Sequence, residues 1–267
     1  MMYMKHRCDY ATDIGKLREK NEDAVMCAQF RYTFLKETDG AILAIVADGM
    51  GGHSRGEVAS RIAVTHLAGI INYGINFWLR EGQKEEIDRR MEGWMKKAMM
   101  HANKRVVEEG KKKESWKTGT TATMAYFTGN TLYFAHVGDC RIYLLERDGG
   151  MAQLTRDHTI AWLLYEQGEI KRREDICLHP ARNRLTRYIG QEELMIESVD
   201  FGRRELTSGM KVLICSDGLY DMVREETIAE ILRGSREPSD CCKALINAAN
   251  DAGGEDNISV VVIFTEE

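Results

Sequence analysis

Short, nearly continuous apolar runs are the strongest constraint on how this 267-residue chain folds. Ala41–Ala47, Lys211–Cys215 and Ile258–Phe264 are rich in Ile, Val, Leu and Ala. Runs of this length favour strands over helices, and the unbroken apolar character of Ala41–Ala47 indicates a strand covered on both faces. Three more strands are predicted at Thr120–Phe127, Thr131–His136 and Arg141–Leu145, the first two flanking a hairpin turn at Gly129–Asn130.

Helical periodicity occupies other parts of the chain. Apolar residues recur at three- and four-residue steps in Gly56–Ile71 and in Lys84–Glu109, so each stretch can present one apolar stripe. Two further helices are expected at Glu225–Leu232 and Pro238–Ala252. Strands and helices therefore come in blocks rather than in strict alternation. This pattern favours an α+β fold with antiparallel sheets and packed helices over a doubly wound parallel sheet.

The composition indicates a soluble intracellular protein. The net charge of −5 gives no sign of the basic footprint of a nucleic-acid-binding protein. No apolar run approaches the length of a membrane span, and the N-terminus lacks the apolar core of a signal peptide. The seven cysteines include no C-x-x-C pair, which disfavours a disulfide framework or a zinc site and fits a reducing cytoplasm. With two prolines and no Pro/Gly/Ser linker, residues 1–267 are expected to form a single domain.

Aspartates stand where several of the predicted strands begin or end. Asp48 follows ILAIVA and Asp217 follows VLICS, while Asp139 lies between two predicted strands and Asp256 precedes ISVVVIF. Carboxylates gathered beside an apolar core repel one another and are costly to desolvate, and hard cations relieve that cost. Oxygen ligands of this kind suit Mg²⁺ or Mn²⁺ rather than zinc. The alternative is that each aspartate is only a turn residue after a strand.

A glycine-rich stretch, Asp48–His53, joins a predicted strand to a predicted helix and lets the backbone approach a ligand closely. It lacks the G-x-G-x-x-G spacing of dinucleotide sites, and the chain has neither a P-loop nor an H-E-x-x-H motif. Cysteine-based phosphatases place an arginine six positions after the nucleophile, and none of the seven cysteines has one. The aspartates are therefore the main candidates for chemistry.

Eight segments, taken in order, make the chain similar to a known family. They are Thr12–Asp23, Val46–His53, Thr118–Ala122, His136–Tyr143, Leu154–His158, Arg184–Gly190, Cys215–Gly218 and Asp256–Ser259. They resemble motifs of the protein phosphatase 2C family of metal-dependent Ser/Thr phosphatases, its compact bacterial members in particular, over roughly residues 10–265. The resemblance implies a four-layer α-β-β-α sandwich with two central antiparallel sheets. It also implies a flap segment beside the site, roughly at residues 157–190.

The resemblance assigns metal ligands residue by residue. Asp48 matches the carboxylate that bridges two metal ions, and Gly49 matches a backbone carbonyl ligand of the second ion. Asp217 and Asp256 match the other ligands of the first ion. The implied cofactors are two or three Mn²⁺ or Mg²⁺ ions.

Three more positions carry family roles. Asp139 matches the ligand of a third, weaker ion, and Asp23 matches an acid near the second ion that often acts through water. Arg18 matches the arginine that grips the substrate phosphate, where its planar guanidinium can hold two oxygens at once. The alternative is that Arg18 pairs structurally with a nearby acid such as Glu22. With this set present, the resemblance implies an active enzyme in which a hydroxide bridging two metal ions attacks phosphorus directly. The expected partners are phosphorylated proteins, with a cognate Ser/Thr kinase, and the expected state is a monomer.

His53 is the candidate general acid for the leaving serine or threonine oxygen. Animal members of the family carry their acid histidine directly after the Asp-Gly pair, whereas Met50, Gly51 and Gly52 intervene here. A surface or helix-capping histidine, with metal-bound water as the acid, is the alternative. His136 and His158 are interpreted as structural.

The flap contains arginines that could form a positive field for phosphoproteins or could pair with flap carboxylates such as Glu174 and Asp175. They are Arg172, Arg173, Arg182, Arg184 and Arg187. Two other functions remain open at this stage. One is a catalytically weak, phosphatase-like sensor or binding module, and the other is a phosphatase of small molecules, which would use the same chemistry at phosphorus.

Overall fold

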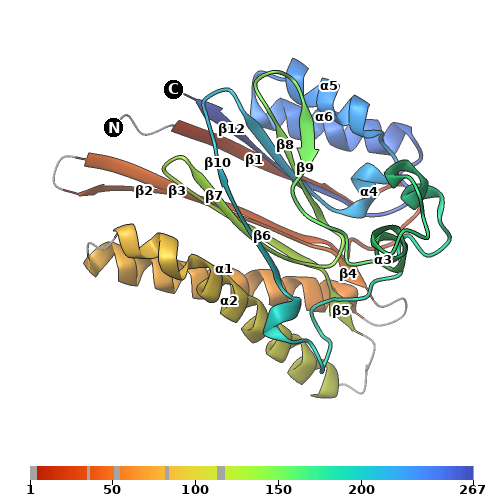
Figure 1. Ribbon diagram of the computed structural model, residues 1–267, viewed down its shortest axis with the longest axis horizontal. Coiled ribbons are helices and arrows are strands. Elements are labelled where there is room, and N and C mark those ends of the chain that lie inside the picture. The colour runs from red at the N-terminus through yellow and green to blue at the C-terminus, as the bar shows by residue number, and fades with distance from the viewer. Residues whose placement is uncertain (1–4, 35–36, 51–54, 82–83, 113–117, 267) are drawn as a thin grey trace.

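The computed structural model describes residues 5–34, 37–50, 55–81, 84–112 and 118–266, and it places two antiparallel sheets face to face (Figure 1). One sheet has the order β1-β12-β11-β8-β9. Its strands are β1 (Lys5–Asp13), β8 (Arg141–Leu145), β9 (Met151–Gln153), β11 (Lys211–Cys215) and β12 (Ile258–Glu266). All of its neighbouring strands pair antiparallel, as the block pattern of the sequence predicts.

The second sheet has the order β10-β7-β6-β3-β2. Its strands are β2 (Ala24–Phe34), β3 (Glu37–Ala47), β6 (Ala122–Thr128), β7 (Thr131–Val137) and β10 (Asp200–Glu205). The predicted hairpin is confirmed, since β6 and β7 pair antiparallel around a turn in which Gly129 has a φ of +55°. A short ladder of β4 (Gly49–Met50) and β5 (Gly119–Thr120) extends beyond the end of β3.

Helices cover the outer face of each sheet and complete the four layers. Helices α1 (Gly56–Glu81) and α2 (Lys84–Lys112) lie under the second sheet, and α5 (Glu225–Gly234) and α6 (Pro238–Asp251) lie over the first (Figure 1). The predicted α+β sandwich is therefore confirmed. Helix α1 continues to Glu81, past the predicted end at Ile71, through a stretch that still carries apolar residues, whereas α2 ends at Lys112, close to the predicted end at Glu109. No helix among the described residues is both long and apolar enough to cross a membrane.

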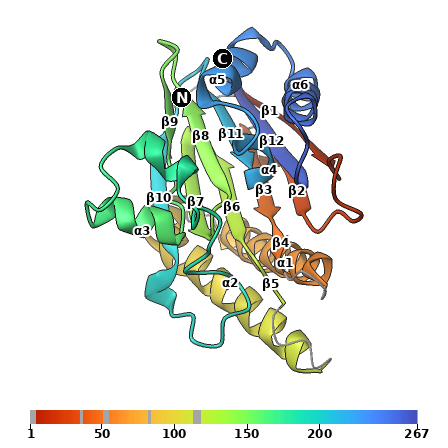
Figure 2. The ribbon, with the colours of Figure 1, turned by 90° about the vertical axis from the view of Figure 1, so that its right-hand side faces the viewer.

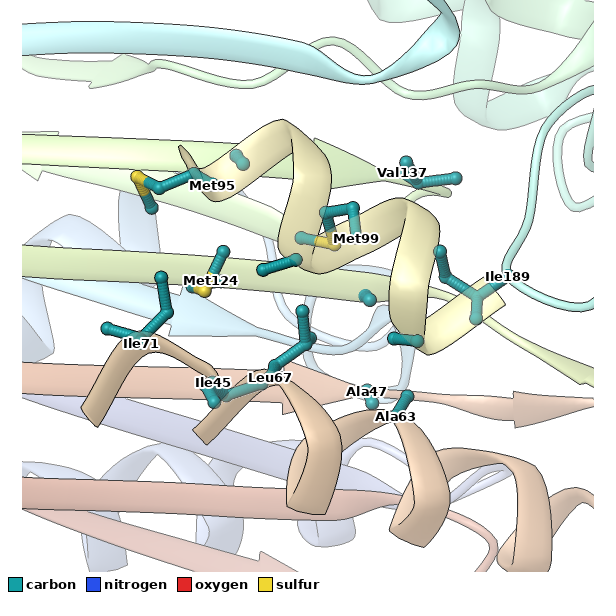
Figure 3. Close-up of a cluster of buried hydrophobic side chains, with 14 of the residues drawn as sticks. Ile45, Ala47, Ala63, Leu67, Ile71, Met95, Met99, Met124, Val137 and Ile189 are labelled. Carbon is teal, nitrogen blue, oxygen red and sulfur yellow. The ribbon is translucent and has the colours of Figure 1, made fainter. Parts of the chain in front are cut away.

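The apolar side chains form one cluster between each pair of layers. Figure 3 shows the cluster between α1, α2 and the second sheet, where Leu67, Met95 and Met99 point toward Ile45 and Met124. Full burial of each such side chain contributes about 1.5–3 kcal/mol of transfer free energy. This packing fixes the sheet against its helices and so holds the strand ends in place.

Strand β3 shows why a continuous apolar run was needed. Leu43 and Ile45 point into the cluster with α1 and α2, whereas Ile42 and Val46 point into the cluster between the two sheets. Because side chains alternate along a strand, a strand that is covered on both faces must be apolar at every position. The prediction for this run is confirmed.

The segment 157–190 lies outside the two sheets, on the side of β8 and β10 (Figure 2). It carries α3 (Ile160–Glu166) and the 3₁₀ turn η1 (Arg173–Leu178). Thr159 pairs with Leu185 near the base of the segment, and Ile189 pairs with Thr120 where the segment returns to β5. A second 3₁₀ turn, η2 (Ile196–Ser198), leads from here into β10.

Candidate functional site

The aspartates at the strand ends come from both sheets. Asp48 follows β3 of the second sheet, and Asp139 lies in the turn from β7 to β8, which passes from one sheet to the other. In the first sheet, Asp217 opens the short helix α4 (Asp217–Tyr220) directly after β11, and Asp256 precedes β12. The fold thus delivers carboxylates from separate parts of the chain to one end of the sandwich.

Asp48 is the centre of this acid cluster, which we define as Asp23, Asp48, Asp139, Asp217 and Asp256. Burial raises the pKa of Asp48 well above its usual value, and the charges of the other four aspartates raise it further. Asp48 is therefore within electrostatic range of all of them. Burial also raises the pKa of Asp217 to about 7, and that of Asp23 to about 8. The chain buries these acids where each makes the ionisation of its neighbours harder.

Two oxygens of the cluster lack a donor. Among the described residues, no hydrogen-bond donor reaches Oδ1 of Asp23 or Oδ1 of Asp217, although both atoms are buried. The other oxygen of Asp23 accepts a hydrogen bond of 2.8 Å from the Ser216 hydroxyl. A buried carboxylate oxygen without a partner is costly, and a hard cation that takes oxygen ligands would satisfy it. These carboxylate oxygens are therefore suitable ligands for Mn²⁺ or Mg²⁺.

Arg18 lies at the edge of the cluster and contacts one member directly. Its Nη2 donates a hydrogen bond of 2.6 Å to Oδ2 of Asp256, and its side chain is 51% exposed. Within the described part of the chain, no three His, Cys, Asp or Glu side chains are already arranged as a ligand set. Asp256 and Asp23 each accept a hydrogen bond from a protein donor, the Arg18 guanidinium and the Ser216 hydroxyl.

Asp48 and Gly49 are held by a tight backbone arrangement. The Asp48 amide donates to the Thr121 hydroxyl at 2.9 Å. A Cβ at Gly49 would lie only 2.3 Å from the carbonyl oxygen of Gly56 and 2.4 Å from that of Glu22. Only glycine fits at this position, so the close approach of three backbone segments requires the Asp-Gly pair that the sequence shows.

Asn257 organises the loop that carries Arg18 and Asp23, and sequence reasoning did not assign it a role. Its side-chain amide donates to the carbonyl oxygens of Ile14 and Lys20, each at 2.9 Å, and its Oδ1 accepts from the Glu22 amide at 2.7 Å. The signal for it was its place next to Asp256 in one of the family motifs. Its contacts are tertiary, so no local pattern reveals them.

Of the histidines singled out from the sequence, His136 has a clear structural role. His53 lies outside the described residues. His136 is fully buried, with Nε2 3.0 Å from the Arg156 carbonyl oxygen and Nδ1 2.7 Å from the Thr123 hydroxyl. Burial, with the nearby His158, lowers the pKa of His136 to about 3. His136 is therefore a neutral part of the sheet rather than an acid for the substrate.

Four of the flap arginines pair with carboxylates. Arg172 contacts Asp175 at 2.7 Å, whereas Arg173, Arg182 and Arg187 reach Glu225, Asp221 and Asp200 on other elements, at 3.1–3.4 Å. Arg184 is exposed, and none of the described carboxylates pairs with it. For these four, the structure favours the reading of ion-pair partners over that of a free positive field, and three of the pairs attach the flap to the sandwich.

Known proteins match this chain along nearly its whole length. The profile of the family described as Protein phosphatase 2C matches residues 10–258. A protein of Listeria innocua named Serine/threonine phosphatase stp is 35% identical over 256 residues, which cover 96% of this chain and 94% of that protein.

Solved structures agree in fold. The Mycobacterium tuberculosis serine/threonine phosphatase PstP/Ppp superposes with a TM-score of 0.80 at 32% identity, covering 98% of this chain and 99% of that one. The catalytic domain of PstP in complex with two manganese ions superposes with a TM-score of 0.77 at 30% identity, and the match covers 100% of both chains.

Proposed function

Because the chain belongs to the protein phosphatase 2C family, we propose that it removes phosphate from phosphoserine and phosphothreonine in proteins, using Mn²⁺ or Mg²⁺. The observation that carries this proposal is the clustering of four aspartates around the buried Asp48, two of which, Asp23 and Asp217, have a buried oxygen that no described hydrogen-bond donor reaches. Gathering these carboxylates costs free energy through desolvation and mutual repulsion, and the fold alone does not require it.

The residues of the acid cluster, with Gly49, would serve as ligands for two metal ions and a third, weaker one. Asp48 would bridge the first two, with Asp217 and Asp256 completing the first site. The Gly49 carbonyl, with Asp23 acting directly or through water, would serve the second site, and Asp139 the third. Bound there, the ions would lower the pKa of a shared water so that it attacks phosphorus directly, and would offset the charge of the phosphate. The two manganese ions in the PstP complex support a centre with at least two ions.

In this proposal, Arg18 would hold the substrate phosphate. Its guanidinium is half exposed at the edge of the cluster, and it lies within range of the charges of Asp256, Asp217 and Asp48. It can donate two parallel hydrogen bonds to one phosphate, which orients phosphorus for attack from the aspartate side. Arg18 cannot act as a base or as a metal ligand, because it stays charged and has no acceptor.

The proton for the leaving oxygen comes from His53 or from water at the site in this proposal. Residues 157–190 would serve as the flap that contacts the substrate protein, and the exposed Arg184, which pairs with no described carboxylate, would be one cation available to that protein. The expected substrates are phosphorylated cytoplasmic proteins, including those phosphorylated by a cognate Ser/Thr kinase, and the expected state is a monomer. Seven cysteines without a disulfide support a reducing compartment.

Hydrolysis of a phosphothreonine peptide tests the function, with p-nitrophenyl phosphate as the small-molecule comparison. We expect turnover with Mn²⁺, none after EDTA and dialysis, and a kcat/KM for the peptide well above that for the aryl phosphate. Full activity in EDTA would contradict the metal chemistry. Binding of the phosphopeptide without turnover would identify a binding module, and a preference for the aryl phosphate would point to small-molecule substrates.

A further inference from the structure

A buried arginine stands next to the acid cluster without belonging to it. Arg141, on β8, forms a forked pair with Asp157, with Nη2 2.6 Å from Oδ2 and Nε 3.1 Å from Oδ1. The two side chains are only 13% and 4% exposed. A buried ion pair is costly unless its geometry and remaining hydrogen bonds are good. Here Nη1 of Arg141 also donates to the Tyr143 hydroxyl at 2.8 Å, and the Gln153 amide donates to Asp157 at 2.9 Å.

The guanidinium of Arg141 stacks on the ring of Tyr220, 3.6 Å from its centroid. Tyr220 lies in α4, three residues after Asp217, and its hydroxyl donates to the backbone carbonyl oxygen of Asp139 at 3.0 Å. Tyr220 thus joins the segment that carries Asp217 to the turn that carries Asp139. Stacking on a buried, fixed guanidinium leaves the ring little freedom, so the hydroxyl is held where the turn needs it.

The other side of the Asp139 turn is held by the residue after Asp157. The His158 amide donates to the Gly138 carbonyl oxygen at 2.7 Å, and the Gly138 amide donates to Nδ1 of His158 at 3.1 Å. The Arg141–Asp157 pair therefore anchors both contacts, one through Tyr220 and one through the adjacent His158. Asp48 and Asp23 rely on different contacts, with Thr121 and with Ser216.

We propose that Arg141, Asp157 and Tyr220 form a positioning unit that sets Asp139 for a third, weaker cation. The two metal ions proposed at Asp48 depend on other residues. The proposal rests on the proposed function, because it concerns one position of the same metal centre. The positioning unit supports only the third, weaker cation site at Asp139. A change in this unit should therefore alter cation affinity at that site without altering it at the two sites that share Asp48.

Tyr220→Phe removes the hydroxyl that contacts Asp139 and keeps the ring on Arg141. The measurement is calorimetric titration of the purified, metal-stripped protein with Mn²⁺ alone, together with thermal melting in EDTA. We expect the weaker binding step to lose about threefold to tenfold in affinity, as for one neutral hydrogen bond, while the tighter step stays within twofold. Asp139→Asn identifies the weaker step by abolishing it, and adding Tyr220→Phe to Asp139→Asn should change nothing further.

Tyr143→Phe is the matched control. It removes the other tyrosine hydroxyl that contacts Arg141, which donates to Glu225 rather than to Asp139. We expect this variant to melt lower and to keep the weaker step unchanged. If Tyr220→Phe leaves the weaker step as in the parent, or weakens both steps while melting like Tyr143→Phe, Tyr220 is a packing residue and the proposal is wrong. A parent with tight Mn²⁺ binding and no weaker step overturns the positioning unit alone, and a parent that binds no Mn²⁺ overturns the proposed function as well.

Discussion

Asp200 and the acid cluster lie in opposite electrostatic settings. Asp200, on β10, contacts Arg156 at 3.1 Å and both Arg187 and His158 at 3.4 Å. Burial opposes ionisation there, but the hydrogen bond from His158 and the charges of His158 and Arg156 hold the pKa of Asp200 below its usual value. In the acid cluster, burial and mutual repulsion raise the pKa of Asp48 instead.

The negative charge of Asp200 is neutralised by cationic side chains of the protein. The charges of the acid cluster are not neutralised in this way to the same extent. Asp200 has its cations in the protein and ties the flap and the β9–α3 connection to β10. Among the described residues, the acid cluster has only Arg18 as a cation in direct ion-pair contact with one of its members. Neutralisation by the chain indicates a structural role, and its absence in a buried cluster indicates a cation site.

The largest expected effect comes from removing a charge at the centre of the acid cluster. Asp48→Asn and Asp217→Asn should each lower kcat on a phosphothreonine peptide at least about a thousandfold, because each removes a ligand charge from the metal centre. The measurement is steady-state turnover at saturating Mn²⁺. Asp200→Asn is the matched control with the same change of one atom, and it should stay within about threefold of the parent. More than about a tenth of the activity remaining in Asp48→Asn would refute its role.

A smaller effect is expected at Arg18, which touches the cluster from outside. Arg18→Ala should raise KM for the phosphopeptide and weaken inhibition by free phosphate, at a cost of about 1.5–3 kcal/mol, or ten- to two-hundredfold. Mn²⁺ affinity without substrate should not fall, because the substitution frees Asp256 from its ion pair. Kinetics and calorimetry together make the distinction. Lower Mn²⁺ affinity with unchanged phosphate inhibition would make Arg18 part of the scaffold.

The smallest effect is expected at Asp200 and concerns stability. Asp200→Asn should lower the free energy of unfolding by about 1 kcal/mol at pH 7, or the melting temperature by roughly 2–4 °C. Because the pKa of Asp200 is lower in the folded state than in the unfolded state, its contribution is fully present above the unfolded pKa of about 4 and is lost progressively as pH falls from there through the lower folded pKa. Denaturant melts from pH 7 to pH 3 should therefore show parent and variant converging. A constant difference across this range would show that the ion pairs are not its source.

In the two large sheets, the strands that could be predicted from the sequence are interior strands, and those that could not are edge strands. The six predicted strands became β3, β6, β7, β8, β11 and β12, which are the interior strands of both sheets. Strands β1, β2, β9 and β10 were not predicted, and each is an edge strand. Interior strands are buried on both faces and must be apolar, whereas edge strands such as β10, with Arg203 and Arg204, carry polar residues that weaken the pattern.

The site divides in a similar way. Asp48 and Asp217 could be singled out because a charge directly after an apolar run conflicts with its surroundings. Tyr220 and Asn257 could not, because their roles depend on contacts with chain segments that lie far away in sequence. Local sequence shows the residues that a site needs for chemistry, and the fold shows those that hold them in position.

Thermal melting of the parent and of Asp48→Asn, each in EDTA and in excess Mn²⁺, tests most directly whether the acid cluster is a cation site. In EDTA, Asp48→Asn should melt above the parent, because the substitution relieves repulsion among buried carboxylates. Mn²⁺ at about a hundred times its dissociation constant should stabilise the parent by about 2.7 kcal/mol, or roughly 5–10 °C, and the variant far less, so the order reverses. If Asp48→Asn melts below the parent in EDTA and Mn²⁺ shifts both proteins equally, the cluster is not the cation site.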